Sequence, residues 1–582
     1  MKNPLTGARA ALVVTLLLSA SLLWQATPAG AHVSEAEALT AARKGAQWIA
    51  LLQELDGELG SFGGDWSMIG LASLGINAAD VRAAPGEPSA QDFYLSQWTA
   101  EPSLLSVPTD YERAILGGYA GGLEPSRLGA RTNLLADLAA FFDGHELGEA
   151  GATNTQVFGV LALRAIDGPG DVIETLVQRV REQQHADGGW NFAAAAKTSE
   201  ADVTGAALAA LCAAGVPSSD SAVVKALAYL HTVQDSATGG FVNPKVNTDS
   251  TAWVVSGLDT CGIDPQGAEW TTTAGKTPLD FLLAQQNEDG SFQLHPGDES
   301  EGLYATQDAV RALSGAGFIV APPLREGGAP AVRSAPAVAA GTPVPMTLAI
   351  DAAGHVTGGS SLRMCKVLAP VGATVAQALA DAELSSTPAY CVSDLALEGE
   401  RIVRLNGVSA EPGTSAWQVS REGGAGEAQA GGTVGLGALV QVRLVPSTQA
   451  PVQTPQTPPA PPAQVASPSP RTVVRPRLAV AVLTRVVHGH VSLTVICPRS
   501  SAACAGTVQL SLSLPSVHGR LREQVVGRHV VRLAPGGAAA ISVALDRQAL
   551  AALRRHDDRL ARIVVLAGTP SSLAASASTV LR

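Results

Sequence analysis

Aromatic residues and cysteines are scarce in this chain of 582 residues. Phe, Trp and Tyr together make up 4% of it, and there are six cysteines. No two cysteines have Cys-x-x-Cys spacing and no histidine cluster lies near them, so structural zinc is not expected. The arginines are scattered with few aromatics between them, which disfavours nucleic-acid binding. After residue 31, no apolar run is long enough to span a bilayer.

The N-terminal segment is typical of an export signal. Lys2 and Arg9 precede an apolar run from Ala10 to Leu23, and the small residues Ala29-Gly30-Ala31 follow it. We therefore predict that residues 1–31 are a cleaved signal peptide and that the protein is secreted or held at the cell surface. An uncleaved anchor is the alternative, although the run is shorter than the roughly 20 residues of a spanning helix.

The cysteines agree with an oxidising compartment, because they fall as three local pairs. Six cysteines allow 15 connectivities. Proximity and domain assignment favour one set of pairs: Cys212 with Cys261, Cys365 with Cys391, and Cys497 with Cys504.

Two Pro-rich stretches divide the chain. Pro322 to Pro345 is rich in Ala, Pro and Gly, and Pro446 to Pro476 is a longer Pro-, Gln-, Thr- and Ser-containing tract. Such segments are typical of linkers. We predict domains at residues 33–320, 346–445 and 477–582, joined by linkers at 321–345 and 446–476.

Charge differs between the two ends of the chain. Residues 32–320 hold 37 acidic and 14 basic residues, whereas residues 471–582 hold 4 acidic and 15 basic ones, all of them arginine. The basic end could contact a cell-wall polymer, an anionic membrane surface or the acidic domain of the same chain. Ordinary surface charge is the simpler alternative.

A segment recurs three times in the first domain at a nearly constant interval. It runs from Gln184 to Trp190, from Gln234 to Phe241, and from Gln286 to Phe292. Self-similarity at such a period indicates stacked supersecondary units. In each copy we expect the Gln to bond loop backbone, a Gly to supply positive φ, and the aromatic to fill the gap between helix pairs.

Six helix pairs are predicted in this domain. The second helix of each pair is rich in small residues, so six of them can sit close together inside a ring of bulkier helices. We therefore predict a closed α/α toroid, an α6/α6 barrel. The second helices are expected to begin near Asp65, Asp110, Thr153, Asp202, Asp249 and Thr306, and the first helices to lie near 37–53, 91–98, 134–142, 172–184, 222–233 and 278–286.

Four aspartates lie where these second helices begin. Asp65, Asp110, Asp202 and Asp249 are interpreted as N-caps. They would also ring one mouth of the barrel, where helix N-termini favour polar or anionic groups. We therefore predict that they are ligand-binding residues.

The Gln-x-x-Asp-Gly-Gly-Trp segment and the Asp-x-Thr pattern resemble the repeats of the terpene cyclase and protein prenyltransferase β-subunit superfamily. That resemblance covers about half the chain and implies the toroid, but the chemistry of the enzymes is missing. There is no Asp-x-Asp-Asp acid, no matching zinc-ligand set and no Gly-Cys-Gly-Glu-Gln thioester, and aromatics for carbocation stabilisation are few. An enzyme is therefore not favoured, and no catalytic residue or metal ligand is assigned.

The second domain resembles the small β domain that follows the barrel in transcobalamin and intrinsic factor. The resemblance rests on Gly372–Val375, Ile402–Gly407, Trp417–Val419 and Gly435–Val440. Those proteins hold a corrinoid between the two domains, and their barrel carries a disulfide that Cys212 and Cys261 resemble. By this analogy a small ligand, with a corrinoid as one candidate, would lie between the toroid mouth and the sheet carrying Trp417.

The third domain alternates apolar and polar residues in six segments, which predicts an antiparallel β-sandwich. None of His185, His231 and His295 is assigned as a metal ligand, since lone surface histidines are common. Three functions remain: a secreted binder of a small ligand, a surface scaffold for a polymer or protein, and a prenyl or terpene enzyme.

Overall fold

The computed structural model describes residues 33–446, apart from 61–63, 101–104, 299–301, 355–360, 390 and 422–429, and beyond residue 478 only the strands. The predicted signal peptide therefore lies outside the described residues, as does Cys497 of the third predicted disulfide. No helix among these residues is long and apolar enough to cross a membrane.

The described part of the chain up to residue 313 is mainly helical, with one short hairpin of β1 (Phe241–Val242) and β2 (Val246–Asn247), and its helices follow the predicted pairs closely. Small-residue runs and the 3.6-residue apolar period favour helix here, and Gly follows six of the twelve helices within three residues. The helices are α1 (Glu35–Leu51), α2 (Gly64–Ser73), α3 (Ala90–Ala100), α4 (Pro108–Ala120), α5 (Leu134–Ala139), α6 (Thr153–Ala165), α7 (Gly170–Glu182), α8 (Ala201–Ala213), α9 (Ser221–Val233), α10 (Thr248–Thr260), α11 (Pro278–Ala284) and α12 (Leu303–Leu313).

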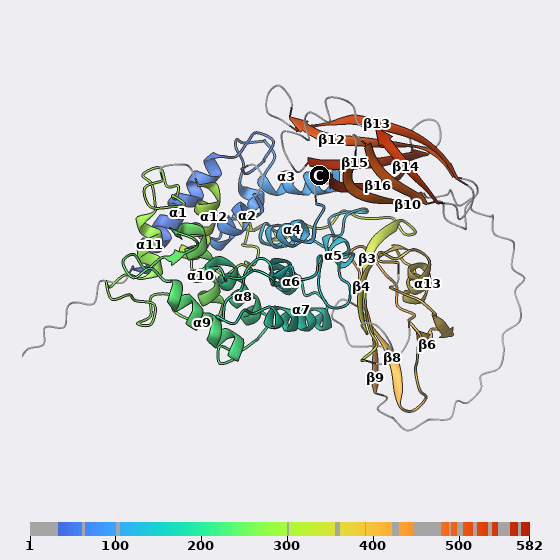
Figure 1. Ribbon diagram of the computed structural model, residues 1–582, viewed down its shortest axis with the longest axis horizontal. Coiled ribbons are helices and arrows are strands. Elements are labelled where there is room, and N and C mark those ends of the chain that lie inside the picture. The colour runs from blue at the N-terminus through green and yellow to red at the C-terminus, as the bar shows by residue number, and fades with distance from the viewer. Residues whose placement is uncertain are drawn as a thin grey trace, which may run out of the picture.

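The even-numbered helices form a closed inner ring. Each packs on the next, from α2 through α4, α6, α8 and α10 to α12, and α12 packs on α2 again. Small residues permit this spacing: a Cβ on Gly257 of α10 would lie 2.3 Å from the carbonyl oxygen of Gly205 on α8. The odd-numbered helices lie outside, and α1 packs against α12. This arrangement agrees with the predicted toroid (Figure 1).

The repeated segment bonds the end of an outer helix to the next outer helix or to the loop before it. Gln184 Nε2 donates to the carbonyls of Gly188 and Ala222, both at 2.8 Å, the second at the start of α9. The aromatic is fully buried at Trp190, Phe241 and Phe292. Its backbone N–H donates to a threonine of the following inner helix, as from Trp190 to Thr204 at 3.0 Å. The predicted role of the segment is confirmed.

A further copy of this segment begins at Gln53, which sequence reasoning missed. Gln53 Nε2 donates to the carbonyls of Gly57 and Val81. Its spacing to Gly57 matches that of Gln184 to Gly188, but no Trp or Phe follows in the expected place, since Leu59 fills it. In this copy, therefore, only the spacing of Gln53 and Gly57 could have identified the repeated segment from the sequence.

The small β domain follows at residue 343. Its main sheet has the order β4-β3-β9-β8, in which β3 and β9 are parallel and the other pairs antiparallel. Helix α13 (Val375–Ser385) packs on β4. The strands are β3 (Pro343–Asp351), β4 (Leu362–Pro370), β8 (Ser415–Arg421) and β9 (Leu439–Pro446), with a second sheet of β5 (Ala396–Glu398), β6 (Arg401–Leu405) and β7 (Val408–Ser409).

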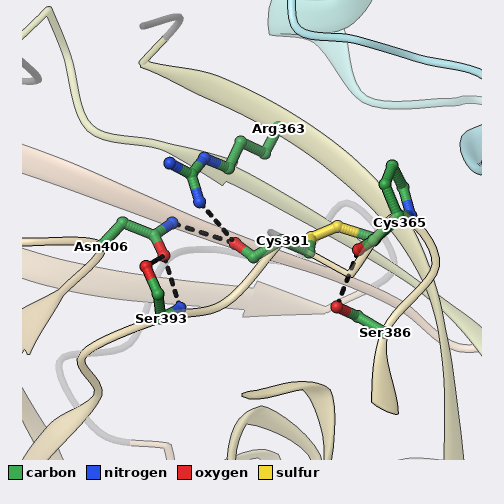
Figure 2. The surroundings of a disulfide bond; sticks show 7 residues. Arg363, Cys365, Ser386, Cys391, Ser393 and Asn406 are labelled. Atoms are coloured by element: carbon green, nitrogen blue, oxygen red, sulfur yellow. Dashed lines mark hydrogen bonds between the residues drawn. A yellow bond between two sulfur atoms is a disulfide. The ribbon is translucent and has the colours of Figure 1, made fainter. Parts of the chain in front are cut away.

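Two of the three predicted disulfides are present. Cys212–Cys261 joins the C-terminal ends of α8 and α10, and Cys365–Cys391 ties β4 to the loop before β5. Figure 2 shows how the backbone at Cys391 is held, because its carbonyl accepts from Asn406 Nδ2 at 3.0 Å and from Arg363 at 3.4 Å. Asn406 thereby links the disulfide loop to the β6–β7 turn.

The strands beyond residue 478 pair into two antiparallel sheets, as a β-sandwich requires. Their orders are β10-β11-β14 and β13-β12-β15-β16. The last strand, β16, was not among the predicted ones. The strands are β10 (Ala479–Val487), β11 (His490–Ile496), β12 (Cys504–Pro515), β13 (Leu521–Leu533), β14 (Ala538–Ala544), β15 (Arg559–Ala567) and β16 (Ser572–Leu581).

The linker at 321–345 is bonded to the toroid over residues 323–333 and again at Pro345. Arg325 pairs with Asp80 at 3.0 Å and Arg333 pairs with Asp92 at 2.8 Å. Asn77 Nδ2 donates to two linker carbonyls, at 2.8 and 2.9 Å. The small β domain then lies beside α5 and α7 (Figure 1).

Candidate functional site

The four predicted mouth aspartates lie in the first turns of inner helices. For α4, α8 and α10, however, the interpretation of these aspartates as N-caps was wrong. Val107, Glu200 and Asn247 occupy the N-cap positions of α4, α8 and α10. Asp110, Asp202 and Asp249 lie two or three residues further on, still close enough to the helix N-terminus to interact with its dipole.

Asp65 and Asp110 share one arginine. Arg113 Nε donates to Asp65 at 2.9 Å, and its Nη2 lies 3.4 Å from Asp110. Asp110 also accepts the backbone N–H groups of Ser106 and Val107. Burial raises the pKa of Asp65 although Arg113 opposes that effect. These two aspartates are therefore held in a structural ion-pair group.

Asp202 and Asp249 belong to a second group, whose other members sequence reasoning missed. Burial, with Asp308 and Asp202 nearby, raises the pKa of Asp249 to about 8. Asp308 pairs with the buried Arg311 at 2.7 Å and accepts from Trp253 Nε1 at 2.9 Å. Asp308 could have been found from the repeat: it lies two residues after Thr306, where Asp202 and Asp249 lie two residues before their threonines.

Four aromatic side chains meet beside this second group. Trp66, Phe158, Trp253 and Phe318 lie in mutual contact, with ring centroids 5.4 to 6.2 Å apart. The Arg311 guanidinium lies 4.3 Å from the Phe318 ring centroid, a cation–π contact. The rings come from α2, α6 and α10 and from the segment after α12. Four of the 24 aromatic residues of this chain therefore meet inside the inner ring.

A cavity of about 680 Å³ lies between the toroid and the small β domain. Its toroid wall is α7 with the loop before α6, and its other wall comes from β3, β4 and β9. Arg443 forms ion pairs with Asp171 on α7 and with Asp351 on β3. The lining residues are Asp143, His145, Glu146, Asp171, Glu174, Thr175, Gln178, Arg179, Glu182, Asp351, Ser361, Leu362 and Arg443. We call this cavity the cleft.

A second hollow of about 330 Å³ adjoins the cleft. Asp171, Glu174, Asp351, Leu362 and Arg443 line both. The ion pairs of Arg443 therefore lie where the two hollows meet.

Two further contacts hold the domains together near the cleft. Lys366 on β4 forms an ion pair with Asp137 on α5, and Asn133 Nδ2 donates to the Pro345 carbonyl at 3.1 Å. Burial raises the pKa of Asp137, with Lys366 opposing. The two walls of the cleft are thus fixed to each other by side-chain bonds.

The predicted ligand residues do not meet at this cleft. The mouth aspartates line neither of these hollows. Trp417, expected on the ligand-facing sheet, is 1% exposed in the core of the small β domain. Their ligand-binding roles remain predictions. The cleft residues were missed because two domains supply them, and no sequence motif joins α7 to β9.

No metal site is found among the described residues, which contain no group of three or more His, Cys, Asp or Glu that could hold an ion. The three histidines considered earlier have local partners. His185 contacts Ser199 and Ala194, His295 contacts the Val246 carbonyl, and His231 stacks on Trp270 with 4.0 Å between ring centroids.

No model of a known protein family matches the sequence, and no curated protein does. Among solved structures, haptocorrin in complex with Cbi is similar over 71% of this chain and 98% of its own, at 13% identity and a TM-score of 0.31.

Two further solved structures are each similar over 48% of this chain. The ent-copalyl diphosphate synthase from Streptomyces platensis matches over 51% of its own length, at 19% identity and a TM-score of 0.29. A type II terpene cyclase from Scytonema, solved with geranylgeranyl dihydroxybenzoate, matches over 98%, at 13% identity and a TM-score of 0.35. At such scores none of these likenesses identifies the family of this chain.

Proposed function

We propose that this protein binds a small ligand in the cleft between the toroid and the small β domain. The observation that carries the proposal is the cleft itself, with walls from two domains and a volume of about 680 Å³. That volume falls within the usual range of about 300–1,000 Å³ for ligand pockets, which often lie at domain interfaces.

Secretion or surface attachment is part of this proposal. The apolar N-terminal segment and the two disulfides support it, because disulfides persist in oxidising compartments. A corrinoid stays one candidate ligand for two reasons. The order of the two domains is the one expected from the transcobalamin resemblance, and the similar structure of haptocorrin was solved in complex with Cbi. A cell-wall polymer has no support from the described residues.

The test uses native mass spectrometry of the full chain recovered from its source, followed by absorbance titration with hydroxocobalamin and cobinamide. Thr175→Trp fills the cleft from α7 without changing charge. Thr40→Trp is its matched control, because both threonines donate their hydroxyls to the carbonyl four residues earlier, Thr40 at 2.6 Å and Thr175 at 2.9 Å. We expect a bound small molecule that Thr175→Trp excludes and Thr40→Trp retains.

A chain that carries no small molecule and takes up none of the probes would overturn this function. Retention of the bound molecule by Thr175→Trp would place the ligand outside the cleft and would equally contradict the proposal.

A terpene cyclase-like enzyme is the second candidate. One observation favours it: Asp249, whose pKa is raised to about 8 by burial and the neighbouring Asp308 and Asp202, lies in the same group as Trp253 and its aromatic neighbours. A protonated carboxyl near pH 7 is suited to act as an acid. Incubation with geranylgeranyl diphosphate, followed by gas chromatography, tests this; product from the native chain but not from Asp249→Asn would support an enzyme.

A further inference from the structure

We infer that the ligand of the cleft is an organic cation with more than one amine, and that it competes with Arg443 for Asp171 and Asp351. This inference rests on the proposed function and names the chemical class of its ligand. Three features of the cleft carry it: the charge of its lining, the small number of apolar side chains there, and the position of Arg443 between the two hollows.

The lining has an excess of negative charge. Six carboxylates, from Asp143, Glu146, Asp171, Glu174, Glu182 and Asp351, face two guanidinium groups. Arg179 is engaged by Glu146 at 3.0 Å and Glu182 at 3.2 Å. Among the described residues, Asp143 and Glu174 form no ion pair. An anionic ligand would be repelled here, whereas a protonated amine would neutralise part of the excess negative charge of the carboxylates.

The described lining offers few apolar side chains to a ligand. Among the described residues of the lining, Leu362 is the one aliphatic side chain and is 7% exposed, and no Phe, Trp or Tyr is present. Flat or hydrocarbon ligands need such contacts. Thr175, Gln178 and Ser361 supply hydroxyl and amide groups instead, which can accept hydrogen bonds from ammonium groups. The cleft therefore favours a hydrophilic, positively charged molecule.

Arg443 already occupies the place of one such cation. It bonds Asp351 on its own domain at 3.2 Å and reaches across to Asp171 on the toroid, so it bridges the two walls. Burial raises the pKa of Asp171, which means that this carboxylate is poorly solvated. A ligand amine placed between the same two carboxylates would replace the guanidinium, and the side chain, half exposed on β9, would swing into solvent.

Isothermal titration of the full chain with spermidine at low salt tests the inference. We expect one saturable site whose affinity falls as salt is added. Glu174→Gln should weaken binding about two- to fivefold, the range expected for one exposed ion pair. Arg443→Gln should tighten binding about two- to fivefold, because the competing cation is gone.

Two controls separate the cleft from the acidic surface as a whole. Glu269→Gln removes an exposed carboxylate outside the cleft and should leave the spermidine affinity unchanged. Thr175→Trp should abolish binding while Thr40→Trp does not, provided that both variants melt like the native chain. Spermidine binding that survives Thr175→Trp would be nonspecific and would overturn the inference.

The remaining outcomes are also decisive. Uptake of citrate or a corrinoid, lost in Thr175→Trp, with no spermidine uptake, would overturn the cationic class and leave the binding function intact. Weaker or unchanged binding by Arg443→Gln would overturn the competition with Arg443. Absence of every ligand would remove the proposed function as well.

Discussion

Gln286 donates a hydrogen bond to the carbonyl of Ala41, 245 residues earlier in the chain, at 2.8 Å. The same side-chain amide donates to Gly290 at 3.1 Å. Gln184 makes the same kind of bond to Ala222 on the next outer helix, α9, and here the next outer helix is the first one. The last pair is therefore fastened to the first.

Replacing Gln286 with Ala should lower the free energy of unfolding by about 1–3 kcal/mol, because two partly buried bonds are lost and two carbonyls keep no substitute. Urea denaturation followed by circular dichroism measures it. Gln178→Ala is the control, since Gln178 is exposed and donates only to Glu182. Equal midpoints for the two variants would contradict the role of Gln286.

Gly188→Ala should destabilise the toroid more than Gly215→Ala does. Both glycines have positive φ, 95° and 86°, so both substitutions carry a backbone strain of about 1–3 kcal/mol. Only at Gly188 would the added Cβ also lie 2.4 Å from a backbone oxygen, that of Lys225. Thermal melts of the two variants give the comparison. A smaller loss at Gly188 would show that the helix pairs are less tightly spaced than described.

The free energy of unfolding should fall as pH rises from about 4 to about 8, in part because of Asp249. Its pKa is raised to about 8 in the fold, whereas an unfolded Asp titrates near 3.9. The native state thus holds the extra proton in this window, and its stabilisation is lost as that proton leaves. Asp259, raised to about 7 mainly by burial, acts in the same direction.

Urea midpoints at pH 5 and pH 8 check this, with Asp249→Asn alongside. The variant cannot ionise, so its stability should fall less between the two pH values than that of the native chain. Glu269→Gln should keep the native difference. An identical pH dependence of the native chain and Asp249→Asn would refute the shifted pKa.

Replacing both Cys212 and Cys261 with Ala should cost about 4 kcal/mol, because the disulfide closes a loop with a sequence separation of 49 residues. Differential scanning calorimetry of the toroid transition measures the loss. Both sulfurs lie near helix C-termini, where the Ala side chains fit without clash. A cost below about 1 kcal/mol would mean that the inner ring holds these helix ends without the bond.

The sequence predicted the helices better than the sites, because a helix depends on residues that are close together in the sequence. The helix starts near Asp65, Asp202 and Asp249 follow from a repeated pattern within a few residues. Asp308 escaped notice because its position in the repeat is shifted, although its side chain comes near Asp249 and Asp202 in space. The cleft could not be predicted, since Asp171 and Arg443 meet across a domain interface.

Trp417 shows a second limit of the sequence, because its burial could not be predicted. A tryptophan on a sheet strand was assigned to the ligand side, but an alternating strand has two faces and the sequence does not say which one is covered. The neighbouring sheet and α13 cover this one, and Trp417 lies in their core. Large apolar side chains such as that of Trp are usually buried inside the domain that carries them.

The bonded linker limits how far the small β domain can travel. Arg333 is held on the toroid by Asp92 and by the Gly122 carbonyl, and β3 begins at Pro343. The stretch between them spans at most about 35 Å when extended. A domain released from Asp171, Asp137 and Asn133 would therefore stay on a short tether, at a high effective concentration near α7. Opening and reclosing of the cleft would then be an intramolecular event whose rate does not depend on protein concentration.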